Sequence, residues 1–364
     1  MVDIKRYVYV IAILMVVSYI ANKLKNRFID NGQDEEYELI RKYLLNESPL
    51  NGYNKPKLWI HTKYSTNSRK WKSFYSRNST DLNEPYIHLT IRSIVNHCGD
   101  SFHICLIDDE SFSKLIPSWD VNVTTLLEPF KSKMRELGLA QLIYIYGGMT
   151  VPNSFVCNQN LFEMYNNGTN GEKQPFVVET LNRTSNLQKE SRKLLFVPDM
   201  YFMGAKKKDS VIKELVDYLK IQNKNPHFSR EHEFLGETTQ WLLNTIEEHK
   251  MNLLGGELIG VKTNGRKPVL LEDLFEENYL DLHPNCYGVY VPNDELLSRT
   301  KYNWFASLSG HEILASNMII SKLIGIAMVD NNPTDDTNNT ALLMSGLPSD
   351  ARDIENLKNS QKIT

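Results

Sequence analysis

Cysteine is scarce in this chain of 364 residues, and neither sign of charge is in large excess. The four cysteines are widely spaced, and none of them forms the close pair typical of a metal site. Cys98 and Cys105 flank a predicted helix-to-strand turn, where a disulfide and buried free thiols are both open alternatives. The formal net charge of −3 gives no reason to expect a basic surface for nucleic acid. We therefore expect no nucleic-acid partner.

Several catalytic motifs are also missing. The chain has no Gly-X-Ser-X-Gly segment, no Walker loop and no dinucleotide-binding fingerprint. His311-Glu312 resembles the start of a metalloprotease motif, but no second histidine follows at helical spacing. The lysines at 206–208 suggest phosphate binding, although a solvated loop is the favoured interpretation.

The longest apolar run lies near the N-terminus, between basic residues on both sides. Residues 7–22 carry no charge, and residues 1–6 form a short tail before them. Its apolar part, Tyr7–Ala21, would make about 22 Å of helix, short of the roughly 30 Å core of a bilayer. Snorkelling lysines and arginines would complete the span, so we predict a transmembrane anchor at 7–22. A cleaved signal peptide is the alternative, because Val16 and Ser18 offer a cleavage site.

The membrane orientation stays open. Basic residues flank both sides of the run, so the positive-inside rule favours neither orientation. Sequons for N-glycosylation favour a body that faces the lumen of the endoplasmic reticulum or Golgi. We therefore expect a single-pass membrane protein. The sequons begin at Asn46, Asn78, Asn122, Asn167, Asn182 and Asn338.

Beyond the anchor, the chain divides by composition into three parts. Residues 23–54 are polar and charged and are predicted to form a stem. Residues 55–329 alternate strand and helix patterns, and we expect one α/β domain there. Residues 330–364 open with a polar, turn-rich stretch and are predicted to be a disordered tail.

The first elements of the domain predict a parallel sheet. Apolar strands at Leu58–Ile60 and Phe102–Ile107 are separated by a helix that begins at Pro85. A helix at Glu128–Tyr146 and a strand at Met149–Phe155 follow. A strand, helix, strand order implies right-handed crossovers, with ligands at the carboxyl ends of the strands. Later strands are expected at 176–178, 194–197 and 287–291, and later helices at 210–219, 234–246 and 311–323.

Asp108 and Asp109 stand at such a carboxyl end and are the first candidates for catalytic residues. Paired carboxylates in this position bind a metal ion, a ribose or an incoming hydroxyl group. The alternative is that one of them caps a helix starting at Ser111.

The segment Lys131–Phe155, with its Tyr-Gly-Gly turn after a long helix, resembles glycosyltransferases of the type A fold, particularly capsular-polysaccharide and sugar-binding-region transferases. The resemblance implies a mostly parallel, Rossmann-like sheet flanked by helices. It also implies a nucleotide-diphosphate sugar as donor, a glycan or protein hydroxyl as acceptor, and Mn²⁺ or Mg²⁺ held by two aspartates. This chain has Pro152 and Ser154 at those positions, and proline offers no side-chain oxygen to a cation. With its Leu-Ile-Asp-Asp, Tyr-Gly-Gly and Val-Pro-X-Ser-Phe segments and the late Asn303-Trp304-Phe305, the sequence is also similar to uncharacterised glycosyltransferase-like proteins of large DNA viruses.

The resemblance also suggests donor-binding residues. Arg135 would pair with the diphosphate, although it lies one helical turn before the position of the family's arginine. Gly147 and Gly148 would bring the backbone close to the donor, or simply end the helix. Asn153 and Ser154 would bind sugar or phosphate, or form a polar turn.

These observations predict a membrane-anchored protein that transfers a hexose from a nucleotide-diphosphate sugar. The alternative is a catalytically inactive scaffold of the same fold that binds glycans or proteins, because fold alone does not determine function.

Overall fold

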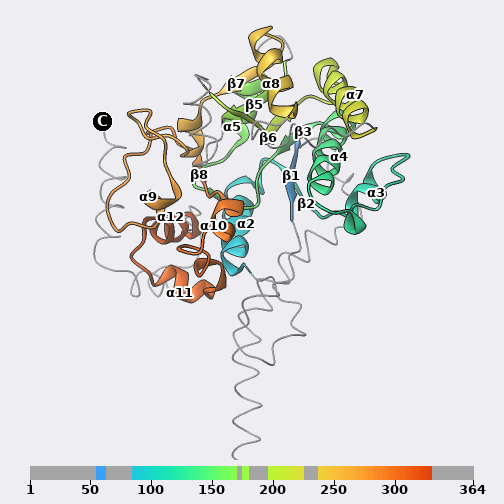
Figure 1. Ribbon diagram of the computed structural model, residues 1–364. Coiled ribbons are helices and arrows are strands. Elements are labelled where there is room, and N and C mark those ends of the chain that lie inside the picture. Colours follow the sequence, from blue (N-terminus) through green and yellow to red (C-terminus); the bar gives the residue numbers. More distant parts are fainter. Residues whose placement is uncertain (1–54, 63–83, 170–173, 180–195, 225–236, 330–364) are drawn as a thin grey trace, which may run out of the picture. The chain divides into compact units, whose positions relative to one another are not determined.

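A computed structural model describes residues 55–62, 84–169, 174–179, 196–224 and 237–329 (Figure 1). These residues all lie within one compact unit, Pro49–Thr364. The predicted anchor at 7–22, the stem at 23–54 and the tail at 330–364 lie outside the described residues. Among the residues that are described, no helix has the length and apolar character needed to cross a membrane.

A mainly parallel sheet forms the centre, which confirms the predicted α/β class. Its strand order is β2-β1-β3-β6-β5-β7, and β6 alone runs antiparallel to its neighbours. The strands are β1 (Lys57–His61), β2 (His103–Ile107), β3 (Gly148–Thr150), β5 (Phe176–Glu179), β6 (Pro198–Ala205) and β7 (Asn252–Leu254).

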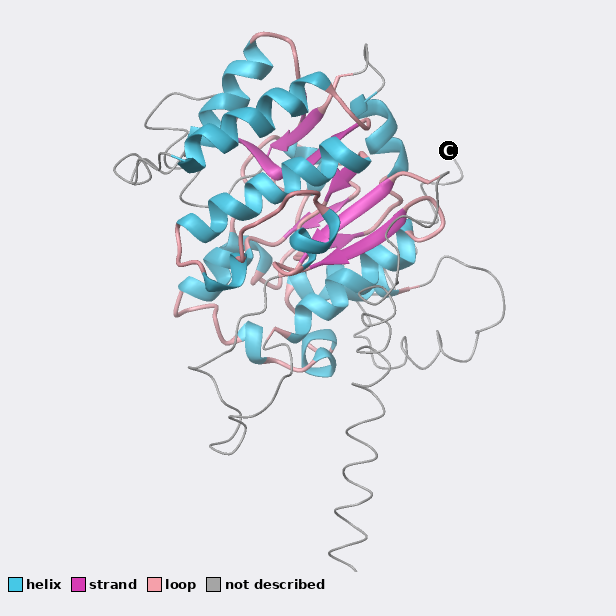
Figure 2. Cartoon of the chain, turned by 90° about the vertical axis from the view of Figure 1, so that its right-hand side faces the viewer, coloured by secondary structure: helices cyan, strands magenta, loops and turns pink. Residues whose placement is uncertain are grey.

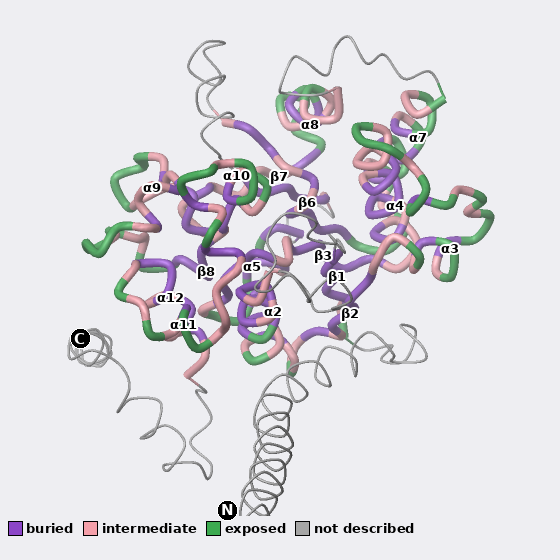
Figure 3. Tube along the Cα trace, turned by 60° about the horizontal axis from the view of Figure 1, so that its bottom comes forward, coloured by how far each residue is buried: buried purple, intermediate pink, exposed green. Residues whose placement is uncertain are grey.

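The apolar runs at β1 and β2 explain the centre of this sheet. Every residue of β1 is buried, as are the last four of β2. Such runs without polar alternation are typical of parallel strands covered on both faces. Figure 2 shows helices on both sides of the strands, and Figure 3 shows the strands as mostly buried chain.

Helices α4 and α7 pack together and bury one face of the sheet. Trp59 of β1, Leu142 of α4 and Leu215 of α7 belong to the same apolar core. Elsewhere in the domain, helix α2 contacts the short strand β4 and helix α12. The helices are α2 (Pro85–Cys98), α3 (Ser111–Leu115), α4 (Phe130–Tyr146), α5 (Phe162–Thr169), α7 (Ser210–Lys224), α8 (Glu237–Glu247), α9 (Leu271–Leu274), α10 (Asn293–Ser298), α11 (Gly310–Leu314) and α12 (Ile319–Met328), with short 3₁₀ turns η2 (Val123–Thr125), η4 (Gly256–Ile259) and η5 (Phe305–Ser307).

The predicted single strand at Met149–Phe155 is wrong. The chain leaves the main sheet after β3 and enters β4 (Phe155–Cys157), which pairs antiparallel with β8 (Gly288–Tyr290) in a separate sheet. Pro152 lies at the break, where it has no N–H to donate to a ladder. Its carbonyl accepts a hydrogen bond from the Phe155 N–H at 3.1 Å, which closes a turn between the strands.

Two later elements also differ from the prediction. Of the strand expected at 194–197, residues 194 and 195 lie outside the described residues, residues 196 and 197 are not in a strand, and β6 begins at Pro198. The helix expected at 311–323 is two helices. A capping box at Ser309 opens α11, which ends at Leu314, and α12 begins at Ile319.

The four cysteines are all buried and free, so the Cys98–Cys105 disulfide is not formed. Cys105 belongs to β2 and to the core under α4, whereas Cys98 is the last residue of α2.

Candidate functional site

Charged side chains gather at the carboxyl edge of the parallel sheet, beside the first turns of α4. His61 ends β1, and Asp109 follows β2 by two residues. Because β1 and β2 are parallel neighbours with His61 opposite Ile107, the residues after them meet at one edge. Helix α4 crosses back from there and carries Lys131 and Arg135.

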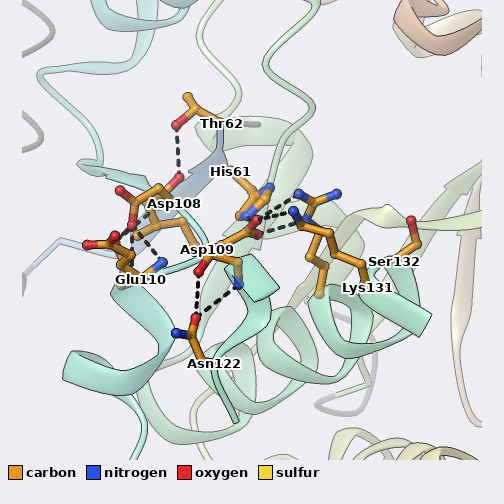
Figure 4. A network of polar contacts seen from close by, with 12 residues as sticks. His61, Thr62, Asp108, Asp109, Glu110, Asn122, Lys131 and Ser132 are labelled. Carbon is orange, nitrogen blue, oxygen red and sulfur yellow. Dashed lines mark hydrogen bonds and ion pairs between the residues drawn. The ribbon is translucent and has the colours of Figure 1, made fainter. Parts of the chain in front are cut away.

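Asp109 is the centre of this cluster (Figure 4). Arg135 donates to it with two prongs, Nε to Oδ1 and Nη2 to Oδ2, both at 2.7 Å. His61 Nε2 lies 3.0 Å from Oδ1, and Lys131 Nζ lies 3.8 Å from Oδ2. The Nη1 group of Arg135 donates to Glu128, whose side chain is 56% exposed. We call His61, Asp109, Lys131 and Arg135 the charged cluster.

The charged cluster is mostly shielded from water. The side chains of His61 and Arg135 are each 6% exposed, and that of Asp109 is 12% exposed. Burial alone would raise the pKa of Asp109, but hydrogen bonds from Arg135 and His61 outweigh it and hold this pKa well below its usual range. Burial alone would lower the pKa of Arg135, but its hydrogen bonds to Asp109 and the nearby charge of Glu128 raise it. The carboxylate and the guanidinium are therefore both ionised.

His61 is held in place by its ring as well as by Asp109. The ring stacks on Phe112 of α3, with centroids 5.5 Å apart and planes within 10°. The next residue, Thr62, donates its hydroxyl to the Ile107 carbonyl at 3.1 Å. Helix α3 therefore fixes the end of β1 from the side.

Asp108 is turned away from the charged cluster, and its carboxylate binds the chain at the start of α3. Its Oδ1 accepts from the N–H groups of Glu110 and Ser111 at 3.1 and 2.8 Å. The Ser111 hydroxyl donates to the same atom at 2.7 Å. Asp108 thus closes the start of α3.

Asn153 and Ser154 follow β3 but are tied to other elements. The Ser154 side chain is buried, and its hydroxyl donates to the Val291 carbonyl at 2.7 Å. The Asn153 carbonyl accepts from the hydroxyl of Thr90 in α2. The structure therefore directs this turn toward α2 and β8, and no described contact joins it to Asp109.

Gly147 and Gly148 lie at the opposite, amino edge of the sheet. Gly147 ends α4, and its carbonyl accepts from the Trp59 indole at 3.1 Å. Gly148 stands beside Lys57, the first residue of β1. The length of β1, about 13 Å at 3.3 Å per residue, separates this edge from His61. The lysines at 206–208 are exposed near the same edge, as predicted for a solvated loop.

A divalent metal does not fit the donor set that the structure describes. Across the described segments, no group of three or more His, Cys, Asp or Glu side chains could hold a metal ion. Both oxygens of Asp109 already accept from a guanidinium, and the Ser154 hydroxyl is engaged internally. The charged cluster places two cations, Lys131 and Arg135, around the Asp109 carboxylate, and Arg135 also pairs with the exposed Glu128.

Two members of the charged cluster, His61 and Lys131, were not predicted as site residues. His61 directly follows the apolar run at Leu58–Ile60, so the carboxyl-end rule applied to β1 would have found it. Lys131 stands four residues before Arg135, a spacing that places both on one helix face.

Acid is expected to weaken the fold through Asp109. Its folded pKa is below its unfolded value of about 3.9, so its contribution to stability is complete above that value. The contribution is lost as the pH falls from about 4 toward the folded pKa. Urea unfolding between about pH 5 and 2 should therefore show a steeper loss for the wild type than for the Asp109→Asn/Arg135→Gln double variant. Equal slopes would contradict the assignment.

Comparison of the chain with protein-family models, with curated proteins and with solved structures finds no match in any of the three.

Proposed function

We propose that this chain is a membrane-anchored, glycosyltransferase-like protein that binds a nucleotide-diphosphate sugar at the charged cluster and transfers a hexose to a glycan or protein hydroxyl. The observation that carries the proposal is the ionised Arg135, held by Asp109 at the carboxyl edge of a mainly parallel sheet. That edge is where ligands bind in sheets of this class.

Cations would replace the metal of the resembled transferases. Negative charge develops on the departing diphosphate, and fixed positive groups stabilise it. The Nη1 end of Arg135 faces the exposed Glu128, so a phosphate that displaces Glu128 would meet the guanidinium there. Lys131, with 22% of its side chain exposed, supplies the second positive charge.

In this proposal Asp109 is a positioning residue. With its pKa held low, its carboxylate is a poor base for an acceptor hydroxyl. Its two hydrogen bonds instead fix the plane of the guanidinium, as a preorganised site requires.

The second candidate function is a non-catalytic scaffold. It is favoured by the state of the other predicted site residues, since Asp108 closes α3 and the Ser154 hydroxyl is buried against Val291. A scaffold of this kind would bind a glycan or a protein through another surface.

The test is calorimetric titration of the full chain with UDP-sugars and GDP-sugars, in manganese and again in EDTA. We expect binding to at least one donor that is unchanged by EDTA. Lys131→Gln should weaken it about tenfold, since hydrogen bonds to charged groups contribute about 1.5–3 kcal/mol. Lys114→Gln, an exposed change on the neighbouring helix α3, is the matched control and should have no effect.

Each remaining outcome has a defined meaning. Binding that requires manganese would overturn the cation mechanism, because it would require a metal site. Absence of binding to every donor would overturn the transferase proposal and favour the scaffold.

A further inference from the structure

Two buried thiols lie side by side at the junction between α2 and the small sheet. Cys98 is the last residue of α2, and Cys157 is the last residue of β4. Their Sγ atoms are 3.8 Å apart, although 59 residues separate them in the sequence. Both residues are 0% exposed.

The two elements that carry these thiols are already fixed against each other. The Cys157 N–H donates to the hydroxyl of Ser93, one turn before the end of α2, at 2.9 Å. Earlier in the helix, Thr90 donates to the carbonyl of Asn153, just before β4. The thiols are therefore held together by contacts that do not depend on sulfur.

We propose that Cys98 and Cys157 are an intramolecular disulfide site, closed when the chain folds in the presence of a small-molecule disulfide such as oxidised glutathione. One cysteine thiolate attacks the glutathione disulfide, which forms a mixed disulfide and releases one glutathione thiol. The other cysteine thiolate then attacks the mixed disulfide at the protein sulfur and releases the second glutathione. The two cysteines lose two protons and two electrons in total, and the glutathione disulfide is reduced to two thiols.

The geometry requires only a small closure. A disulfide has a sulfur–sulfur bond of about 2.05 Å, so the present separation must shorten by about 1.8 Å. The other cysteines are held elsewhere: Cys105 donates to the His103 carbonyl at 3.6 Å, and Cys286 to the Gly288 carbonyl at 2.9 Å. Cys105 and Cys286 therefore serve as control thiols, because they are buried and have no described sulfur neighbour.

The bond would form during folding, as the contacts between α2 and β4 bring the thiols together and before packing seals them from solvent. Once folded, burial and the neighbouring Cys98 raise the pKa of Cys157 well above its ordinary value, which suppresses the reactive thiolate. The sequons and the apolar N-terminal segment predict an oxidising compartment, where such bonds persist.

The test is to refold the full chain in a mixture of oxidised and reduced glutathione, then denature it, alkylate free thiols and map the peptides by mass spectrometry. We expect a linked Cys98–Cys157 peptide with Cys105 and Cys286 alkylated. The Cys105→Ser/Cys286→Ser variant should keep the link, and Cys157→Ser should lose it. The oxidised form should melt about 5 °C or more above the reduced form.

Two results would overturn the proposal. One is alkylation of both Cys98 and Cys157 after refolding with oxidised glutathione. The other is their linkage to Cys105 or Cys286 instead of to each other. Should Cys157→Ser fail to fold, the Cys105→Ser/Cys286→Ser variant still decides, because only the proposed pair remains in it. The readout needs no sugar donor, so it is independent of the proposed function.

Discussion

Arg135→Gln is expected to lower the free energy of unfolding by about 3 kcal/mol or more. Removing the guanidinium leaves the Asp109 carboxylate, 12% exposed, without its two-pronged partner. Breaking a buried ion pair by removing one partner typically costs about 3–5 kcal/mol, because an uncompensated charge remains. His61 and Lys131 stay near the carboxylate and would reduce this loss toward its lower end.

The double variant Asp109→Asn/Arg135→Gln should recover most of that stability. Its two amide side chains approximate the shape of the pair and carry no charge. Urea unfolding of the full chain, followed by tryptophan fluorescence, measures the wild type, both single variants and the double variant. The resulting double-mutant cycle gives the coupling energy between the two residues.

Arg92→Gln is the matched control, because Arg92 is exposed on α2. It should change the free energy of unfolding by no more than about 0.5 kcal/mol. If the changes in the free energy of unfolding caused by Asp109→Asn and Arg135→Gln were additive, the two residues would not be coupled. That result would contradict the ion pair at the centre of the charged cluster. In the stable double variant, lost donor binding would then reflect the missing guanidinium and not misfolding.

The first half of the domain could be predicted well because its signals are local. The apolar runs at β1 and β2, the proline that opens α2 and the glycines after α4 each specify an element through nearby residues. Their order then specifies the parallel topology through the handedness of crossovers.

The roles of Asp108 and Asp109 could not be separated from the sequence. Successive side chains in extended chain point to opposite sides, so two adjacent aspartates after a strand meet different surroundings. Asp108 binds the start of α3, and Asp109 accepts from Arg135 of α4, which lies 26 positions later in the sequence. Only the packing of α4 on the sheet decides which is which.

The positions of Gly147-Gly148 and Asn153-Ser154 could not be predicted from the sequence for a different reason. The resemblance placed Gly147-Gly148 and Asn153-Ser154 in one donor site, since few residues separate them. Strand β3 lies between them and carries the chain from the amino edge of the sheet to the carboxyl edge. Sequence proximity across a strand does not imply spatial proximity.

Gly148→Ala is expected to be the most damaging of the small substitutions in this fold. Gly148 has φ of +97°, a conformation that side-chain-bearing residues rarely adopt. A Cβ atom there would lie 2.0 Å from the Lys57 carbonyl oxygen, which is backbone of the adjacent strand and cannot rotate away. The pairing of β3 with β1 would have to open to accommodate it.

We expect Gly148→Ala to lower the free energy of unfolding by at least about 3 kcal/mol, because strain at positive φ adds to the steric overlap. Gly265→Ala is the control, since a Cβ at Gly265 would meet only open space and the Thr263 hydroxyl at 3.9 Å. Urea unfolding of both variants measures the difference. A mild effect at Gly148, close to that at Gly265, would show that β1 and β3 do not approach as closely as described. A large effect would show that the fold itself requires Gly148 of the Tyr-Gly-Gly segment, at the edge of the sheet away from the charged cluster.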